Sequence, residues 1–211
     1  MNRDWSPWIA AITAITAIVA LLQTKQQIKL SNKQHLFDKR VEHYLLAQGL
    51  IQLYQSHETL LAVNEDEPLL SVKFIFTQMT NNLYLENITD VIAHTLEQPY
   101  HKEFLSKMEK LREISTQIKF IFGGKEAALL GNFVLRYQEL LYGLYQYQIL
   151  LKNMNKIAVN FRDTLENAQE KVGEREYREK MLKIINDLNQ AYERIIKAKV
   201  EEKIEKQIKL S

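Results

Sequence analysis

The sequence predicts an all-α protein in which a single amino-terminal transmembrane helix precedes a helical bundle with long, coiled-coil-like helices. Three observations predict this fold. Glycine and proline number only 6 and 3 among 211 residues, whereas folds built from many short strands need such residues at their turns. Residues 5–24 carry no charge, and apolar residues recur at helical spacing through the remaining chain. The hydrophobic content of 46% is sufficient for a packed core, so general disorder is not expected.

The uncharged segment 5–24 has the length of a transmembrane helix. At about 1.5 Å per residue, it would cover roughly 30 Å, the thickness of the hydrocarbon core of a bilayer. Trp5 and Trp8 stand at its start, where tryptophan favours the headgroup level. Two alternatives remain open. A cleaved signal peptide would need a basic start and a cleavage site, which are missing here. A buried helix of a soluble core would also suit the apolar centre at 9–22.

The charges that flank this segment predict its direction of insertion. Arg3 is the basic side chain before it, and Asp4 offsets that charge. Five basic residues follow: Lys25, Lys29, Lys33, Lys39 and Arg40. Because basic flanks stay in the cytoplasm, we expect the amino terminus outside the inner (cytoplasmic) membrane and the carboxyl-terminal domain in the cytoplasm. The predicted membrane anchor consists of Trp5, Trp8, Lys25, Lys29 and Lys33.

One face of the predicted span carries small residues. Ala10, Ala14 and Ala17 lie at small-xxx-small spacing, which allows two helices to approach closely. This face is a candidate surface for packing against a second span. Alanine is also common in spans that do not associate, so composition alone remains the other interpretation.

Few breaks interrupt the chain after this segment. Turns are expected at Pro68, at Pro99, at Gly123-Gly124 and, more weakly, at Gly173, while Thr80-Asn81-Asn82 can cap the start of a helix. We therefore expect a short external tail at 1–4, the transmembrane helix at 5–24, a juxtamembrane helix at 25–63 and a helical bundle at 69–211, with 33–211 forming one packed unit.

The longest regular pattern lies in the carboxyl-terminal half. Apolar residues spaced alternately four and three apart form a heptad seam: Phe133, Tyr137, Leu140, Leu144, Tyr147, Leu151, Met154, Ala158, Phe161 and Leu165. The spacing persists to Val172 and therefore predicts one long helix with left-handed, coiled-coil-like packing. A second apolar series runs over 177–198. The two helices form an antiparallel hairpin if Gly173 turns the chain, or a rod of about 120 Å if it does not. We favour the hairpin.

No catalytic, cofactor or metal site is expected. The chain lacks cysteine, and its five histidines fit no metal-binding spacing. Gly123-Gly124-Lys125 lacks the residues that complete a phosphate loop. The 28 basic and 26 acidic residues leave a net charge of +2, so a nucleic-acid partner is not expected.

Two short elements carry a resemblance to a known group of proteins. Residues 36–44, Leu-Phe-Asp-Lys-Arg-Val-Glu-His-Tyr, follow the predicted span, and 80–86 read Thr-Asn-Asn-Leu-Tyr-Leu-Glu. The first resembles the Leu-Phe-x-x-Arg-x-x-x-Tyr element of uncharacterised bacterial single-pass membrane proteins, and the second is similar to another element in some of them. The resemblance implies a bacterial inner-membrane setting and a helical cytoplasmic domain, and it implies no activity.

These features favour an interaction, scaffold or sensor protein anchored at the cytoplasmic face of a bacterial membrane, without catalytic activity or cofactor. Its expected partners are the lipid bilayer and either another protein or a second copy of the chain. The alternative is a membrane effector of a phage-defence or toxin system, in which the span assembles when the bundle receives a signal. A tethered enzyme has no support in the sequence.

Overall fold

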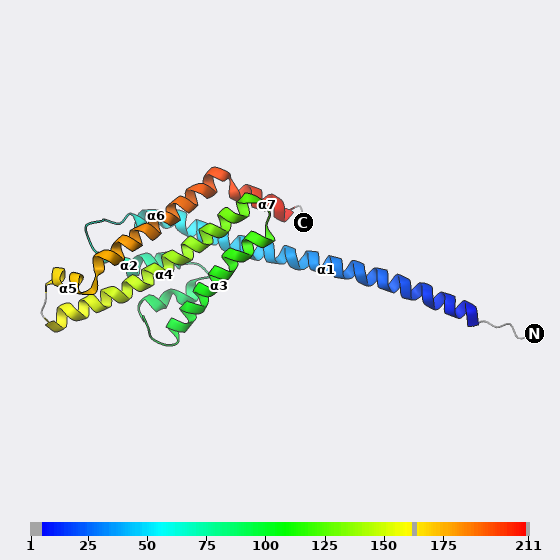
Figure 1. Cartoon of the computed structure of the whole chain (residues 1–211), viewed down its shortest axis with the longest axis horizontal. Coiled ribbons are helices and arrows are strands. Elements are labelled where there is room, and N and C mark those ends of the chain that lie inside the picture. Colours follow the sequence, from blue (N-terminus) through cyan, green and yellow to red (C-terminus); the bar gives the residue numbers. More distant parts are fainter. Residues whose placement is uncertain (1–5, 162–163, 210–211) are drawn as a thin grey trace, which may run out of the picture.

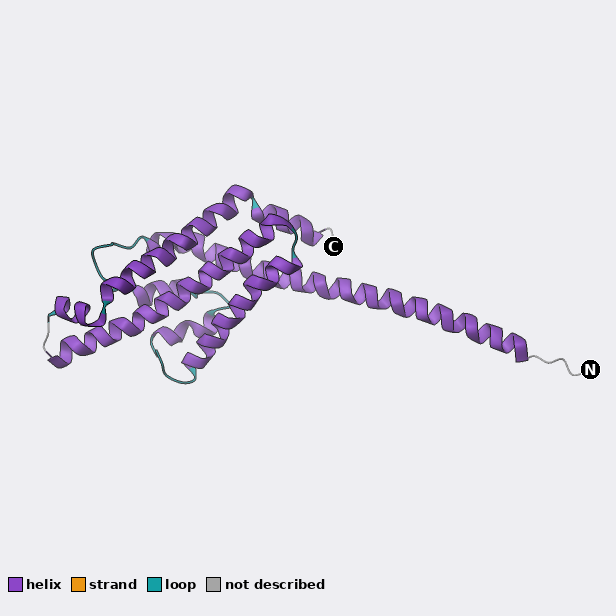
Figure 2. Ribbon diagram, viewed as in Figure 1, coloured by secondary structure: helices purple, strands orange, loops and turns teal. Residues whose placement is uncertain are grey.

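The computed structural model describes residues 6–161 and 164–209, and these residues form helices and loops without any strand (Figure 2). The predicted all-α fold is confirmed. The elements are α1 (Ser6–His57), the 3-10 helix η1 (Glu58–Leu61), α2 (Val72–Met79), the 3-10 helix η2 (Glu86–Ile92), α3 (Tyr100–Ile121), α4 (Gly124–Phe161), α5 (Leu165–Val172), α6 (Glu174–Ala198) and α7 (Val200–Lys209).

The first helix has two parts with different surroundings. α1 is one continuous helix of 52 residues, so no break separates the predicted span from the predicted juxtamembrane helix. Its amino-terminal part projects from the bundle, and its carboxyl-terminal part runs into it (Figure 1). The described side chains from Trp8 to Asp38 are all exposed, whereas Tyr44, Leu50 and Tyr54 are buried. We call residues 8–38 the arm.

The bundle is built around α4, which packs against α2, α3, α6 and α7. α4 and α6 lie side by side and run in opposite directions (Figure 1). The chain reverses between the end of α4 and the start of α6, and within this stretch Gly173 joins α5 to α6 with a φ of 66° and a ψ of 35°, in the left-handed region that glycine adopts without strain. The structure therefore has the antiparallel arrangement and not the continuous rod.

The prediction of one helix reaching Val172 is wrong. α4 ends at Phe161, and Thr164 has extended backbone angles, φ −72° and ψ 157°. The Thr164 hydroxyl oxygen accepts a hydrogen bond from the Asn167 backbone N–H at 3.3 Å and thereby caps the start of α5. The heptad spacing continues across this cap because α5 has its own apolar face, so spacing alone did not reveal the interruption.

A second interpretation also needs correction. Thr80 does not open a helix but ends α2, since its hydroxyl donates to the Phe76 carbonyl oxygen at 2.9 Å. Asn82 stabilises the turn before η2, because its side-chain oxygen accepts from the Leu85 N–H at 2.9 Å. Hydroxyl and amide side chains compete for nearby backbone groups at both helix ends, which is why the motif suggested a start.

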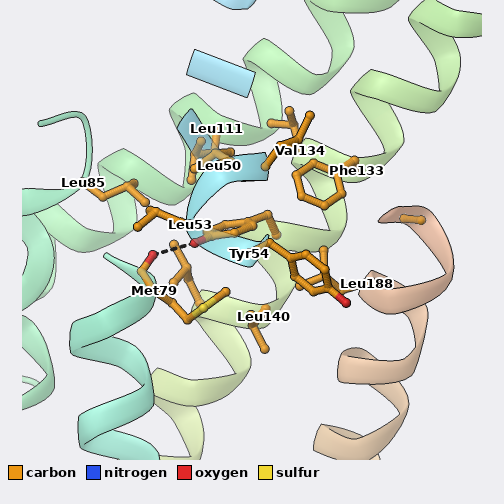
Figure 3. Packing of buried hydrophobic residues seen from close by; sticks show 14 of the residues in the cluster. Leu50, Leu53, Tyr54, Met79, Leu85, Leu111, Phe133, Val134, Leu140 and Leu188 are labelled. Atoms are coloured by element: carbon orange, nitrogen blue, oxygen red, sulfur yellow. Dashed lines mark hydrogen bonds between the residues drawn. The ribbon is translucent and has the colours of Figure 1, made fainter. Parts of the chain in front are cut away.

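The core lies where five helices converge, and Figure 3 shows it from close by. Leu50 comes from α1, Met79 from α2, Leu111 from α3, Phe133 from α4 and Leu188 from α6, and all are buried. The hydroxyl of the fully buried Tyr137 donates to the Met79 carbonyl oxygen at 2.7 Å. That carbonyl belongs to the last turn of α2, where helix carbonyls lack intrahelical partners, so the bond satisfies a group that burial would otherwise penalise.

Candidate functional site

The arm carries large apolar side chains that the bundle does not cover. The exposed fractions of Ile15, Ile18, Leu21 and Leu22 are 62%, 58%, 71% and 58%, and Trp8 is 69% exposed. Apolar surface of this extent marks a site of contact with a membrane or a protein. No helix in the described part of the chain has an apolar stretch long enough to cross a bilayer. The transmembrane part of the predicted fold is therefore not confirmed.

The residues of the predicted anchor fall along this arm where they are described. Trp8, Lys25, Lys29 and Lys33 are exposed on it, and so are Ala14 and Ala17 of the small face. Trp5 lies outside the described residues, as does the side chain of Ala10.

A set of polar contacts fixes the point at which the arm enters the bundle, and we call its residues the collar: Arg40, Tyr44, Ile121, Phe122, Gly123, Glu205 and Gln207. Arg40 donates from Nε to the carbonyl oxygen of Ile121, the last residue of α3, at 2.7 Å. Its guanidinium carbon also lies 6.0 Å from the centre of the Phe122 ring. A cation at the carboxyl-terminal end of a helix is favourable because the helix dipole is negative there. Arg40 therefore joins α1 to the end of α3.

Tyr44 joins the same part of α1 to the last helix. Its hydroxyl donates to Glu205 Oε1 of α7 at 2.8 Å. Burial, followed by the Glu205 carboxylate, raises the pKa of Tyr44 well above its usual value, so the hydroxyl remains a donor at neutral pH. On the apolar side of α7, Val200 and Ile204 are completely buried.

The collar is closed by contacts between α7 and the α3–α4 turn. Gln207 accepts from the Gly123 N–H at 2.8 Å and donates to the Gly123 carbonyl oxygen at 3.0 Å. Lys203 pairs with Glu126 in the first turn of α4 at 2.8 Å. Specific bonds therefore link α1, α3, α4 and α7 at this point. Arg40 and Tyr44, one helical turn apart on α1, thus bond to different elements, α3 and α7.

The heptad seam divides into described and undescribed parts. Five of its members are almost completely buried in α4: Phe133, Tyr137, Leu140, Leu144 and Tyr147. Met154 is buried as well, Leu151 packs half-buried against the core, and Ala158 is half-buried. The side chains of Phe161 and Leu165 lie outside the described residues.

One buried polar group was missed by the sequence reasoning. Glu174 is 1% exposed and accepts a hydrogen bond from the Tyr147 hydroxyl, which itself accepts from the Leu69 N–H at 3.0 Å. Arg178, one turn further along α6, lies 3.4 Å from the other carboxylate oxygen. The Glu-x-x-x-Arg spacing after Gly173 was the available signal, but this spacing is equally common on exposed helix surfaces.

Three or more histidine or acidic side chains do not gather in metal-binding geometry anywhere in the described residues. In comparisons with known proteins, the chain matches no protein-family model, no curated protein and no solved structure. The arm and the collar are therefore the features on which a functional assignment rests.

Proposed function

We propose that this chain is a helical interaction protein, a scaffold or sensor, anchored in the inner membrane of a bacterium by the segment 5–24. Its amino terminus lies outside and its bundle at the cytoplasmic face. The observation that carries this proposal is the arm, where apolar side chains such as Ile15, Ile18 and Leu22 are more than half exposed on a helix that leaves the bundle. Transfer of each such side chain into lipid contributes on the order of 1.5–3 kcal/mol.

The polar part of the arm supports the same arrangement. Lys25, Lys29 and Lys33 follow the apolar part and are exposed, as expected for a basic flank at the cytoplasmic surface. The 14 residues from Lys25 to Asp38 are helical and would separate the bundle from the hydrocarbon core by roughly 20 Å. At this distance from the membrane, the sides of the bundle would remain accessible to a partner protein. The collar would hold the bundle in a defined orientation relative to the arm.

A membrane effector is the second candidate, and the exposed Ala14 and Ala17 favour it, because small residues permit close approach of a second span. Induced expression separates the two candidates. Rapid loss of the membrane potential indicates the effector, whereas an unchanged potential and normal growth indicate the scaffold.

Alkaline carbonate extraction of membranes tests the anchor. We expect the full chain to remain in the membrane pellet, and a variant with Ile15→Lys, Ile18→Lys and Leu22→Lys to move to the soluble fraction. A control variant with Leu70→Lys, Phe74→Lys and Val159→Lys, which changes equally exposed apolar residues of the bundle, should stay in the pellet. Release of the unmodified chain by carbonate would refute the anchor.

Reporter fusions after Ser211 test the direction of insertion. A fluorescent protein that matures only in the cytoplasm should light up, and a phosphatase that is active only in the periplasm should remain inactive, because five basic residues follow the proposed span. The reverse pattern at normal protein abundance would place the bundle on the other side of the membrane.

A further inference from the structure

We infer that the surface on both sides of Tyr84 is the docking site for an acidic amphipathic segment of a partner protein. This inference rests on the proposed function and specifies the surface and the chemistry of the interaction. This surface combines two adjoining hollows, an exposed leucine pair and a lysine without a carboxylate partner.

Tyr84 lies in the turn between α2 and η2, and two hollows adjoin at this residue. One hollow, of about 560 Å³, lies along α1 and is lined by Leu45, Leu46 and Leu83. The other, of about 580 Å³, lies along α3 and is lined by Lys102, Ser106 and Lys107. Tyr84 and Glu42 line both, so the two hollows adjoin at these residues, and we call the two together the Tyr84 groove.

The α1 side of the groove is apolar. Leu83 is 90% exposed and Leu45 is 59% exposed, while Leu85, two residues beyond Leu83, is completely buried. The turn therefore holds a large aliphatic side chain in solvent beside a second one from another element. Gly49, which has no side chain, also lines this hollow and leaves it open beside the two leucines. Such a pair loses contact with water only when a partner covers it.

The α3 side of the groove contains a cation without a counter-charge. Lys107 donates from Nζ to the Tyr84 carbonyl oxygen at 2.7 Å, and its ammonium lies 4.1 Å from the centre of the Tyr84 ring. Of the other charged residues that line this hollow, Lys110 pairs with Glu113 at 2.9 Å and Glu42 pairs with Lys39 at 2.8 Å, whereas Lys102 and Glu103 are exposed. Among the described residues, no carboxylate lies within ion-pair distance of Lys107.

The chemistry of Lys107 specifies what a partner must supply. An ammonium has three N–H donors, and Tyr84 takes one of them. Burial lowers the pKa of Lys107, which is the sign of a cation that has lost part of its hydration without gaining a counter-ion. A carboxylate placed in the groove would compensate for that loss. Lys102 and Glu103 also line this side of the groove, and their opposite charges offset each other, so Lys107 carries the preference for a carboxylate.

The hydroxyl group of Tyr84 lacks a hydrogen-bond partner. Its oxygen is buried, and burial, followed by the Glu42 and Glu113 carboxylates, raises the pKa of Tyr84 to about 12. A buried hydroxyl without a partner costs roughly 1–3 kcal/mol. Tyr84, which lies between the two hollows, is held in place by its two contacts with Lys107.

The bilayer is a poor candidate for this groove. Glu42 lies 18 residues beyond Thr24 along α1, which corresponds to about 27 Å of helix and exceeds the depth of the headgroup layer. The groove is also open and joins an apolar end to a cationic end, as in surfaces that receive an amphipathic segment through leucine-type anchors and acidic side chains. We therefore commit to a protein segment that presents aliphatic residues to Leu45 and Leu83 and a carboxylate to Lys107.

Selection from a random-peptide display library tests the inference. The target is the purified full chain, in nanodiscs or, if it proves soluble, in buffer. We expect the selected peptides to combine Asp or Glu with Leu, Ile or Phe, and to bind at least roughly tenfold more weakly to Lys107→Glu and to Leu83→Asp, since loss of a charge pair or an aliphatic contact is of that size. Peptides with Lys in place of the acid should regain binding to Lys107→Glu.

Matched controls are Lys183→Glu and Val159→Asp, which alter an exposed lysine and an exposed aliphatic residue of other helices and should leave binding unchanged. Equal thermal unfolding of all four variants excludes misfolding as the cause of a loss. The inference is overturned if no acidic apolar consensus emerges, if the peptides bind Lys107→Glu as tightly as the parent, or if inorganic phosphate alone displaces them. If carbonate extracts the chain from membranes but the chain still selects acidic peptides, the proposed membrane anchor is refuted and the proposed docking site in the Tyr84 groove is supported.

Discussion

Raising the pH above 10 is expected to unfold the bundle steeply, with the free energy of unfolding falling by roughly 5 kcal/mol per pH unit near pH 11. Tyr44, Tyr54, Tyr137 and Tyr147 are each buried to 7% exposure or less. Burial raises the pKa of Tyr54 to about 12, and it raises the pKa values of Tyr44, Tyr137 and Tyr147 well above the usual one.

The direction of this dependence follows from the protons bound by each state. In the unfolded chain tyrosine ionises near pH 10, whereas in the folded chain these four remain protonated, so the folded state binds more protons at pH 11. The stability that they contribute is fully present below pH 10 and is lost as the pH rises towards the pKa values of the folded state. Each tyrosine contributes about 1.4 kcal/mol per pH unit in this range.

The measurement is a pH titration of the full chain in detergent micelles, following helix content by circular dichroism and tyrosinate by ultraviolet absorbance. Helix loss and the ionisation of the buried tyrosines should coincide. The variant Tyr54→Phe should make the slope shallower by about 1.4 kcal/mol per pH unit, because one linked proton is removed. Complete ionisation of all 10 tyrosines near pH 10 in a chain that stays helical would contradict the prediction.

Replacing the buried carboxylate of Glu174 is expected to have the second large effect. Glu174→Ala should lower the free energy of unfolding by about 3–5 kcal/mol, the usual cost of removing one partner of a buried ion pair. The Tyr147 hydroxyl would lose its acceptor, and Arg178, whose side chain is 11% exposed, would lose the carboxylate that lies 3.4 Å away. Chemical denaturation of the full chain in micelles measures the loss.

Glu176→Ala is the matched control, because Glu176 occupies the same first turn of α6 but is exposed. It should change the free energy of unfolding by about 0.5 kcal/mol or less. Glu174→Gln retains an acceptor for Tyr147 and should fall between the two. If Glu174→Ala and Glu176→Ala unfold alike, the contacts among Tyr147, Glu174 and Arg178 do not stabilise the bundle.

Local patterns were sufficient for the all-α class and for several helix ends. The scarcity of glycine and proline and the apolar spacing predicted helices throughout, and the described residues contain helices without strands. Gly173 separates α5 from α6 where a break was expected, because its left-handed conformation is set within a single residue. The end of α4 was missed because Thr164 interrupts the helix while the apolar spacing continues.

The polar contacts of the site were decided by tertiary structure alone. Arg40 bonds to Ile121 across 81 residues of sequence and Tyr44 to Glu205 across 161, so no local pattern connects them. The Tyr84 groove likewise requires α1, a turn and α3 to meet. Periodicity reports which face of a helix is apolar, since it follows from the geometry of one helix. Which other helix covers that apolar face, and which polar atoms become buried at the contact, depend on packing between helices that are distant along the chain.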